Sequence, residues 1–111
     1  MVPVVGEVSG VTDPGGEMLR ALADLTRRRI LDELVQRDGQ TLFEICARLA
    51  TKYQLASTRQ AVSQHLAVLE GAGLVVTRRE GRYKFHYLDT SPLDQIALRW
   101  PPRRQTGAED R

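Results

Sequence analysis

One amphipathic segment, followed at once by glycines, constrains the fold of this chain more than any other part of its sequence. Residues 57–75 read STRQAVSQHLAVLEGAGLV. At 100° per residue, a helix over 58–71 has one apolar face, which predicts that this face is buried. The apolar face consists of Ala61, Val62, Leu66 and Leu69, and the opposite, uncharged polar face of Gln60, Ser63, Gln64 and Ala67.

A second helix is predicted just before this one. Thr41 with Glu44 three residues later forms a capping-box pattern. The apolar stripe that follows keeps helical phase as far as Tyr53, so only about four residues, 54–57, remain for a turn. The members of that stripe are Leu42, Ile45, Cys46, Leu49 and Tyr53.

Two β-rich runs follow the 58–71 helix. Residues 74–79 and 83–88 flank the tripeptide EGR, in which Gly81 can form a tight turn. The GAG tripeptide at 71–73 predicts the bend into this hairpin. Two helices joined by a short turn, followed by a hairpin, are typical of a winged helix-turn-helix.

Three further helices complete the pattern. The first is predicted at 17–23 and the second at 26–37, where Asp24 or Thr26 can cap the start and Gly39 the end. A last helix at 91–100 is predicted to begin with Ser91 as its cap and Pro92 at the first position. The apolar stripes of these helices are Met18, Leu19 and Leu22; Ile30, Leu31, Leu34 and Val35; and Leu93, Ile96, Ala97 and Trp100.

The second of these helices also carries charges at helical spacing. Arg28 with Asp32, and Arg29 with Glu33, are predicted to form weak i,i+4 pairs on the surface.

The expected fold class is therefore mainly α with a small β-hairpin, in the order α-α-α-α-β-β-α. The length of 111 residues suits one compact domain. Residues 16–100 are expected to form it, with residues 1–15 as a flexible N-terminal arm and residues 101–111 as a flexible C-terminal tail. Neither the mildly apolar N-terminus nor any other run predicts a signal peptide or a membrane span. With one cysteine, Cys46, the chain cannot form an internal disulfide, so we expect a cytoplasmic protein.

The positive charge of the chain is small in total but concentrated in one segment. The net charge is only +2, yet residues 51–88 hold six Lys and Arg residues against two Glu. Such a surface suits contact with phosphates, although charge alone is equally consistent with a solvated face. The cations of the predicted hairpin are Arg78, Arg79, Arg82 and Lys84.

The polar face of the 58–71 helix favours the first interpretation. Glutamine can contact adenine through two hydrogen bonds, arginine can contact guanine, and an Ala methyl can touch thymine. A face meant only for water would usually carry Lys and Glu. Ser57 or Thr58 is expected to cap the helix, and Arg59 flanks the polar face. His65 lies between the two faces, where a partly buried imidazole could also reach a phosphate.

Three segments together resemble the ArsR/SmtB family of bacterial winged-helix transcription regulators: MLRALADLTRRRILDEL, TRQAVSQHLAVLEGAGLV and RREGRYKFHYLD. The resemblance implies a homodimer that binds a palindromic operator in double-stranded DNA, commonly as a repressor released by a signal. It places the dimer interface on the first and last helices, here Met18, Leu19, Leu22, Leu93, Ile96 and Trp100. It places DNA contacts on Thr58, Arg59, Gln60, Ser63, Gln64 and His65, and on Arg79, Arg82 and Lys84 of the wing.

The chain departs from the metal-sensing members of that family. Many of them use a paired-cysteine motif on the third helix, where this chain has Cys46 alone, in phase with the predicted core. Other members of the family bind metal through ligands on the last helix. In this chain the only candidate ligands near that helix are His86, Asp89 and Asp94. A nickel or zinc effector is therefore a minor alternative. The third helix is also longer, and Lys52 on its extension is a candidate contact to the DNA backbone.

Two other classes of function fit the sequence less well. A winged helix can serve as a protein-interaction module, but a basic wing tip is not needed for that role. An enzyme has no support, because the chain has no Gly-rich phosphate loop, no plausible nucleophile–histidine set and no paired buried carboxylates. Sequence-specific DNA binding remains the leading hypothesis.

Overall fold

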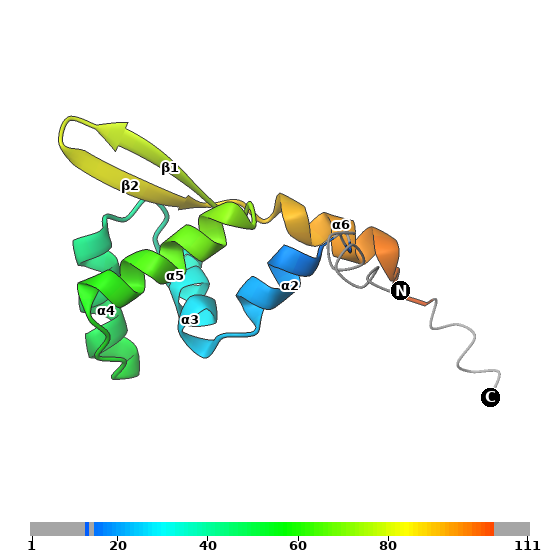
Figure 1. The fold of residues 1–111 in the computed structure, drawn as a ribbon, viewed down its shortest axis with the longest axis horizontal. Coiled ribbons are helices and arrows are strands. Elements are labelled where there is room, and N and C mark those ends of the chain that lie inside the picture. Colours follow the sequence, from blue (N-terminus) through cyan, green and yellow to red (C-terminus); the bar gives the residue numbers. More distant parts are fainter. Residues whose placement is uncertain (1–12, 14, 104–111) are drawn as a thin grey trace, which may run out of the picture.

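The computed structural model describes residue 13 and residues 15–103, and it has the predicted order of elements (Figure 1). The expected arm at 1–15 and tail at 101–111 lie mostly outside the described residues. The elements are α2 (Gly16–Leu22), α3 (Leu25–Gln36), α4 (Leu42–Tyr53), α5 (Arg59–Gly71), β1 (Val75–Glu80), β2 (Tyr83–Leu88) and α6 (Ser91–Arg99).

Helices α2 to α5 and the base of the hairpin share one hydrophobic core. Helix α5 contacts α2, α3, α4 and β1, so it lies at the centre of the domain. Its buried side chains are Val62, Leu66 and Leu69, which confirms the predicted apolar face. Val35, which the sequence places on the apolar face of its helix, is 67% exposed at the end of α3. The rest of the core is Met18, Ala21, Ile30, Leu34, Ile45, Leu49, Leu74 and Val75.

The helix starts follow the predicted caps with one exception. Asp24 caps α3 by accepting from the Arg27 amide, and Thr41 with Glu44 forms the complete capping box of α4. The prediction that Ser91 caps α6 is wrong. Thr90 holds the cap position without a side-chain hydrogen bond, while the Ser91 amide donates to Asp89 Oδ1 at 2.9 Å.

The hairpin is fixed to the domain at its base. The strands are antiparallel, with Val75 paired to Leu88 at the base and Glu80 paired to Tyr83 at the tip. A bridge between Gln40 and His86 joins β2 to the loop before α4, with N···O distances of 3.1 and 2.8 Å. Figure 1 shows the free end of the hairpin projecting away from α6.

A buried carboxylate, which was predicted to be a surface group, connects α3 to α4. Glu33 was expected to pair with Arg29, but it is 0% exposed and accepts from Arg48 at 3.3 Å and Tyr53 at 3.1 Å. Lys52 Nζ lies 2.7 Å from Glu33 Oε2, so this cation pairs within the domain. Arg29 instead pairs with Asp32. The extension of α4 therefore supplies the partners of the Glu33 carboxylate. Such partners are needed because a buried carboxylate without a partner destabilises the folded state.

Candidate nucleic-acid interface

The outward face of α5 has the composition predicted for a surface that reads bases. Gln60, Ser63, Gln64 and Ala67 are all exposed, opposite the buried stripe of the same helix. Thr58 caps the helix by accepting from the Ala61 amide at 3.0 Å, so the free backbone N–H groups of the first turn lie next to the polar face. Arg59 is exposed and Ser57 is half-buried at this end. The arrangement presents donors, acceptors and a methyl group without bulky side chains.

His65 is half-buried on the flank of α5 and is held by a side chain from α3. Its Nδ1 lies 3.2 Å from Nη1 of Arg27 and 3.8 Å from Oδ2 of Asp24. Arg27 also donates to the carbonyl oxygens of Ala21 and Arg20 at the end of α2. The imidazole is therefore part of a group of polar contacts that connects α2, α3 and α5.

The hairpin carries cations that have no carboxylate partner among the described residues. Arg78, Arg79, Arg82 and Lys84 are all exposed. Arg79 lies directly opposite Lys84 in the register, a juxtaposition of like charges that costs stability in an isolated hairpin. Arg78 is placed 5.5 Å from the ring centroid of Tyr87. Unpaired like charges at one tip are what a surface for a polyanion requires.

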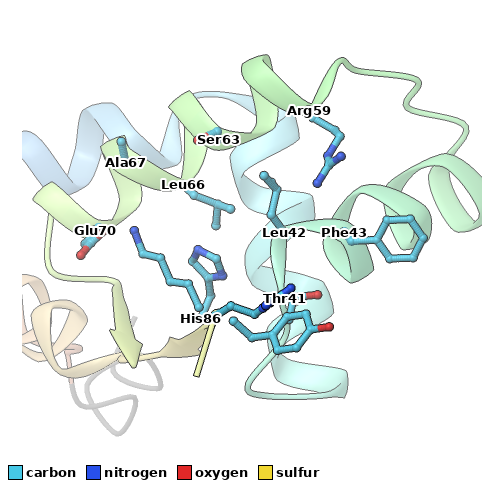
Figure 2. A pocket seen from close by; sticks show the side chains of 12 residues that line it. Thr41, Leu42, Phe43, Arg59, Ser63, Leu66, Ala67, Glu70 and His86 are labelled. Carbon is cyan, nitrogen blue, oxygen red and sulfur yellow. The ribbon is translucent and has the colours of Figure 1, made fainter. Parts of the chain in front are cut away.

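A groove of about 440 Å³ separates α5 from the hairpin (Figure 2). Arg59 and Ser63 line it from α5, and Arg82 and Lys84 line it from the hairpin, so two of the predicted contact regions face one cavity. This groove was not predicted, because it depends on side chains that come from three separate elements. The remaining lining residues are Thr41, Leu42, Phe43, Leu66, Ala67, Glu70, Tyr83 and His86.

Of the three candidate metal ligands, His86 and Asp89 make other contacts, and Asp94 is exposed on α6. His86 is 5% exposed, and its Nδ1 lies 2.9 Å from the Gln40 carbonyl oxygen. Asp89 accepts from both the amide and the hydroxyl of Ser91, which lowers the pKa of its carboxyl. In the part of the chain that the structure describes, no three His, Cys, Asp or Glu side chains gather as a metal site. Burial raises the pKa of the half-buried Cys46 thiol, against an opposing effect of Arg59.

An apolar surface remains on α2 and α6. Helix α6 has no buried residue, and Leu93 and Trp100 are 38% and 58% exposed. Leu19 of α2 is 39% exposed, whereas Met18 is already buried in the core of its own chain. Leu22 and Ile96 are partly buried against that core.

Comparison with known proteins places this geometry in a class of DNA-binding regulators. A model described as a helix-turn-helix domain matches residues 22–78, just over half of the chain. The uncharacterised transcriptional regulator YuzN of Bacillus subtilis is 48% identical over 83 residues, which cover 75% of this chain and 90% of YuzN. The regulator CmtR of Mycobacterium tuberculosis is 45% identical over 74 residues, 67% of this chain but only 57% of CmtR.

Solved structures agree. An ArsR-like transcriptional regulator from Rhodococcus is 33% identical, with a TM-score of 0.62 over 85% of this chain and 79% of that one. The homodimeric winged helix-turn-helix DNA-binding domain Mb0332 from Mycobacterium bovis, at 22% identity, shares the fold, with a TM-score of 0.62 over 99% of this chain and 89% of that one. The chain belongs to the ArsR/SmtB family of helix-turn-helix transcriptional regulators. Among the described helices, none has the length and apolar character needed to cross a bilayer.

Proposed function

We propose that this regulator is a dimeric repressor that binds a palindromic operator and leaves it in response to a signal. One observation carries the proposal: Ser63 and Ala67 of the polar face of α5 line the same groove as two cations of the hairpin, Arg82 and Lys84. In this arrangement α5 enters the major groove, where Gln60, Ser63 and Gln64 contact base edges. The wing cations contact phosphates or the adjacent minor groove and fix the register.

The dimer supplies the symmetry that the operator requires. The apolar side chains of Leu19, Leu93 and Trp100 are exposed in the single chain, and a second copy of the same surface would cover them in an isologous interface. Two α5 helices would then face two half-sites about one helical turn apart. The structurally similar domain from Mycobacterium bovis is described as homodimeric, which supports this assembly.

An affinity measurement on DNA from the chain's own promoter tests the proposal. The purified protein is titrated against a labelled promoter fragment and a scrambled fragment at two salt concentrations. We expect a higher affinity for the promoter at both concentrations, and for both fragments a loss of affinity as salt rises. Equal affinity for the two fragments would overturn sequence-specific binding. Absence of any DNA binding would favour the protein-interaction module instead.

A metal signal is a second candidate, supported by one comparison. The structure of CmtR, at 37% identity and a TM-score of 0.51, is described as that of a cadmium metal sensor. Within the residues described here, no metal-binding cluster supports the same role in a single chain. Operator affinity measured with and without nickel, zinc and cadmium tests this candidate. A metal sensor must bind its operator with a different affinity when the metal is present.

A further inference from the structure

The inner wall of the groove between α5 and the hairpin holds a ring nitrogen, Nε2 of His86, that has no hydrogen-bond partner among the described residues. His86 is 5% exposed, yet its side chain lines the groove between Leu66 and Thr41 (Figure 2). Its Nδ1 lies 2.9 Å from the Gln40 carbonyl oxygen, and a carbonyl can only accept, so Nδ1 carries the proton. Nε2 is then an acceptor, and no described residue donates to it.

The protonation state of His86 fixes what the groove can accept there. Burial is the main reason that the pKa of His86 is lowered, with a smaller contribution from Lys84, although its hydrogen bond with Gln40 opposes the shift. The imidazole is therefore neutral at neutral pH. A ligand group that donates a hydrogen bond, such as a hydroxyl, satisfies Nε2. A phosphodiester has no such donor.

The charge and polarity of the other walls define the remaining chemistry. Three cations, Arg59, Arg82 and Lys84, line the groove against one carboxylate, Glu70. Glu70 accepts from Thr77 at 3.3 Å, and none of the three cations is paired with a carboxylate within the described chain. Leu42, Leu66 and Ala67 supply apolar surface between these groups. A volume of about 440 Å³ is in the range of small-molecule sites.

We infer that this groove is a binding site for a small aromatic acid that bears a hydroxyl group. The carboxylate of the ligand contacts the cations of α5 and the hairpin, its ring lies on the apolar wall, and its hydroxyl donates to His86 Nε2. Neither the family comparison nor the proposed operator contacts assign a small-molecule site at this position.

Occupancy of the groove also affects DNA, a consequence that rests on the proposed function. Arg59, Arg82 and Lys84 are the cations that would face phosphates, and a bound carboxylate neutralises them and repels the DNA backbone. The ligand is therefore an inducer that weakens operator binding. Its effect requires no movement of the helices, because ligand and phosphate compete for the same positive charges.

Calorimetry on the DNA-free protein tests the site by itself. The probes are 4-hydroxyphenylacetate and phenylacetate, which differ only in the hydroxyl group. We expect saturable binding of one 4-hydroxyphenylacetate per chain, and roughly tenfold weaker binding of phenylacetate, which is the loss of about one hydrogen bond. Equal affinity for the two probes, or no saturable binding in the millimolar range, would overturn the assignment.

Two variants locate the binding. His86→Asn keeps a donor for the Gln40 carbonyl oxygen but places no acceptor at the position of Nε2, so it should lower the affinity for 4-hydroxyphenylacetate to that for phenylacetate. Ala67→Phe adds bulk at an exposed groove position and should abolish binding of both probes; thermal melts establish that each variant is folded. If either folded variant binds 4-hydroxyphenylacetate like the wild type, the site is wrong.

Operator binding with and without the probe separates the two proposals. We expect 4-hydroxyphenylacetate to weaken operator binding, and phenylacetate to do so only at about tenfold higher concentration. Unchanged operator affinity at saturating probe would overturn the inducer role. If His86→Asn weakens operator binding but not probe binding, the groove holds a DNA strand instead. If no operator binds at all, the proposed function fails, while calorimetry still decides the ligand site.

Discussion

Arg27 of α3 and His65 of α5 lie 38 residues apart in the sequence, and a contact of 3.2 Å joins Nη1 of the arginine to Nδ1 of the histidine. A guanidinium only donates, so Nδ1 of His65 is the acceptor in this contact. Arg27 also holds the carbonyl oxygens of Ala21 and Arg20, at 2.8 and 3.2 Å. The end of α2 and the flank of α5 are therefore held by one side chain.

Substitution of Arg27 should weaken operator binding without removing a DNA contact. Arg27→Met keeps much of the aliphatic stem but releases both His65 and the end of α2. We expect operator affinity to fall about tenfold, equivalent to the loss of about one hydrogen bond, in fluorescence anisotropy titrations. Arg28→Met is the matched control, because Arg28 donates to Leu22 but is not bonded to α5. Equal losses in both variants would show that the contact between Arg27 and His65 contributes nothing to operator binding.

The polar face of α5 predicts a loss of specificity. Gln64→Ala should reduce affinity for the operator by about 1–3 kcal/mol and leave affinity for scrambled DNA nearly unchanged, because the amide contacts a base edge rather than a phosphate. Gln36→Ala, at the exposed end of α3, provides the control for removal of a surface amide. If the two variants bind the operator equally well, Gln64 does not read a base.

The wing should contribute through charge alone. Arg82→Gln should weaken binding to operator and scrambled DNA alike, and reduce the slope of log affinity against log salt by roughly one unit, since one phosphate contact is lost. The measurement is a salt series with both DNA fragments. A loss confined to the operator would assign Arg82 to base recognition, and an unchanged slope would place it away from the phosphates.

The surface of α2 and α6 predicts the oligomeric state. Leu93→Asp puts a charge into the proposed interface at a position that is 38% exposed in the single chain. We expect a folded monomer by analytical ultracentrifugation, with weaker operator binding because one half-site is lost. Val35→Asp, at a 67% exposed site on α3, should remain a dimer. Dimerisation of Leu93→Asp to the wild-type extent would move the interface elsewhere.

Glu33 predicts how stability depends on pH. Burial raises the pKa of the Glu33 carboxyl, but Lys52, Tyr53 and Arg48 together lower it by more than burial raises it. The pKa in the folded state therefore lies below the ordinary value of 4.5. The stabilisation is fully present above pH 4.5 and is lost as pH falls through the lower pKa of the folded state.

Glu33→Gln should therefore lower the free energy of unfolding at pH 7 by about 2–3 kcal/mol, because charged hydrogen bonds are lost. The difference between wild type and variant should shrink in acid, as urea titrations at pH 7 and near pH 3 would measure. A constant difference across this range would show that the charge of Glu33 contributes nothing.

Local pattern predicted the elements well, but not how they meet. Thr41 and Glu44 predict the start of α4, and the spacing of Val62, Leu66 and Leu69 predicts the buried face of α5. Each of these signals is local, because its residues belong to a single helix and its cap. Glu33 looked like a surface charge because its partners, Arg48, Lys52 and Tyr53, lie 15 to 20 residues away on another helix.

The same limit hid the groove and the environment of His86. Its hydrogen-bond partner Gln40 is 46 residues away, and no spacing rule connects the two. Val35 has the helical phase of a core residue, but it lies beyond the region that the other elements cover. Periodicity assigns a side chain to a face of its own helix, whereas burial depends on what packs against that face.

The attachment of the hairpin has a mechanical consequence. Its base is bonded through Gln40 and His86, and the Leu88 amide donates to Asp38 at 2.7 Å, while the turn at Gly81 is open to solvent. The hairpin is thus held to the domain at its base, whereas its charged end is exposed. Under the proposed function, the end of the hairpin could then follow DNA grooves of different width while α5 stays in place, which would separate adaptation to DNA shape from the reading of bases.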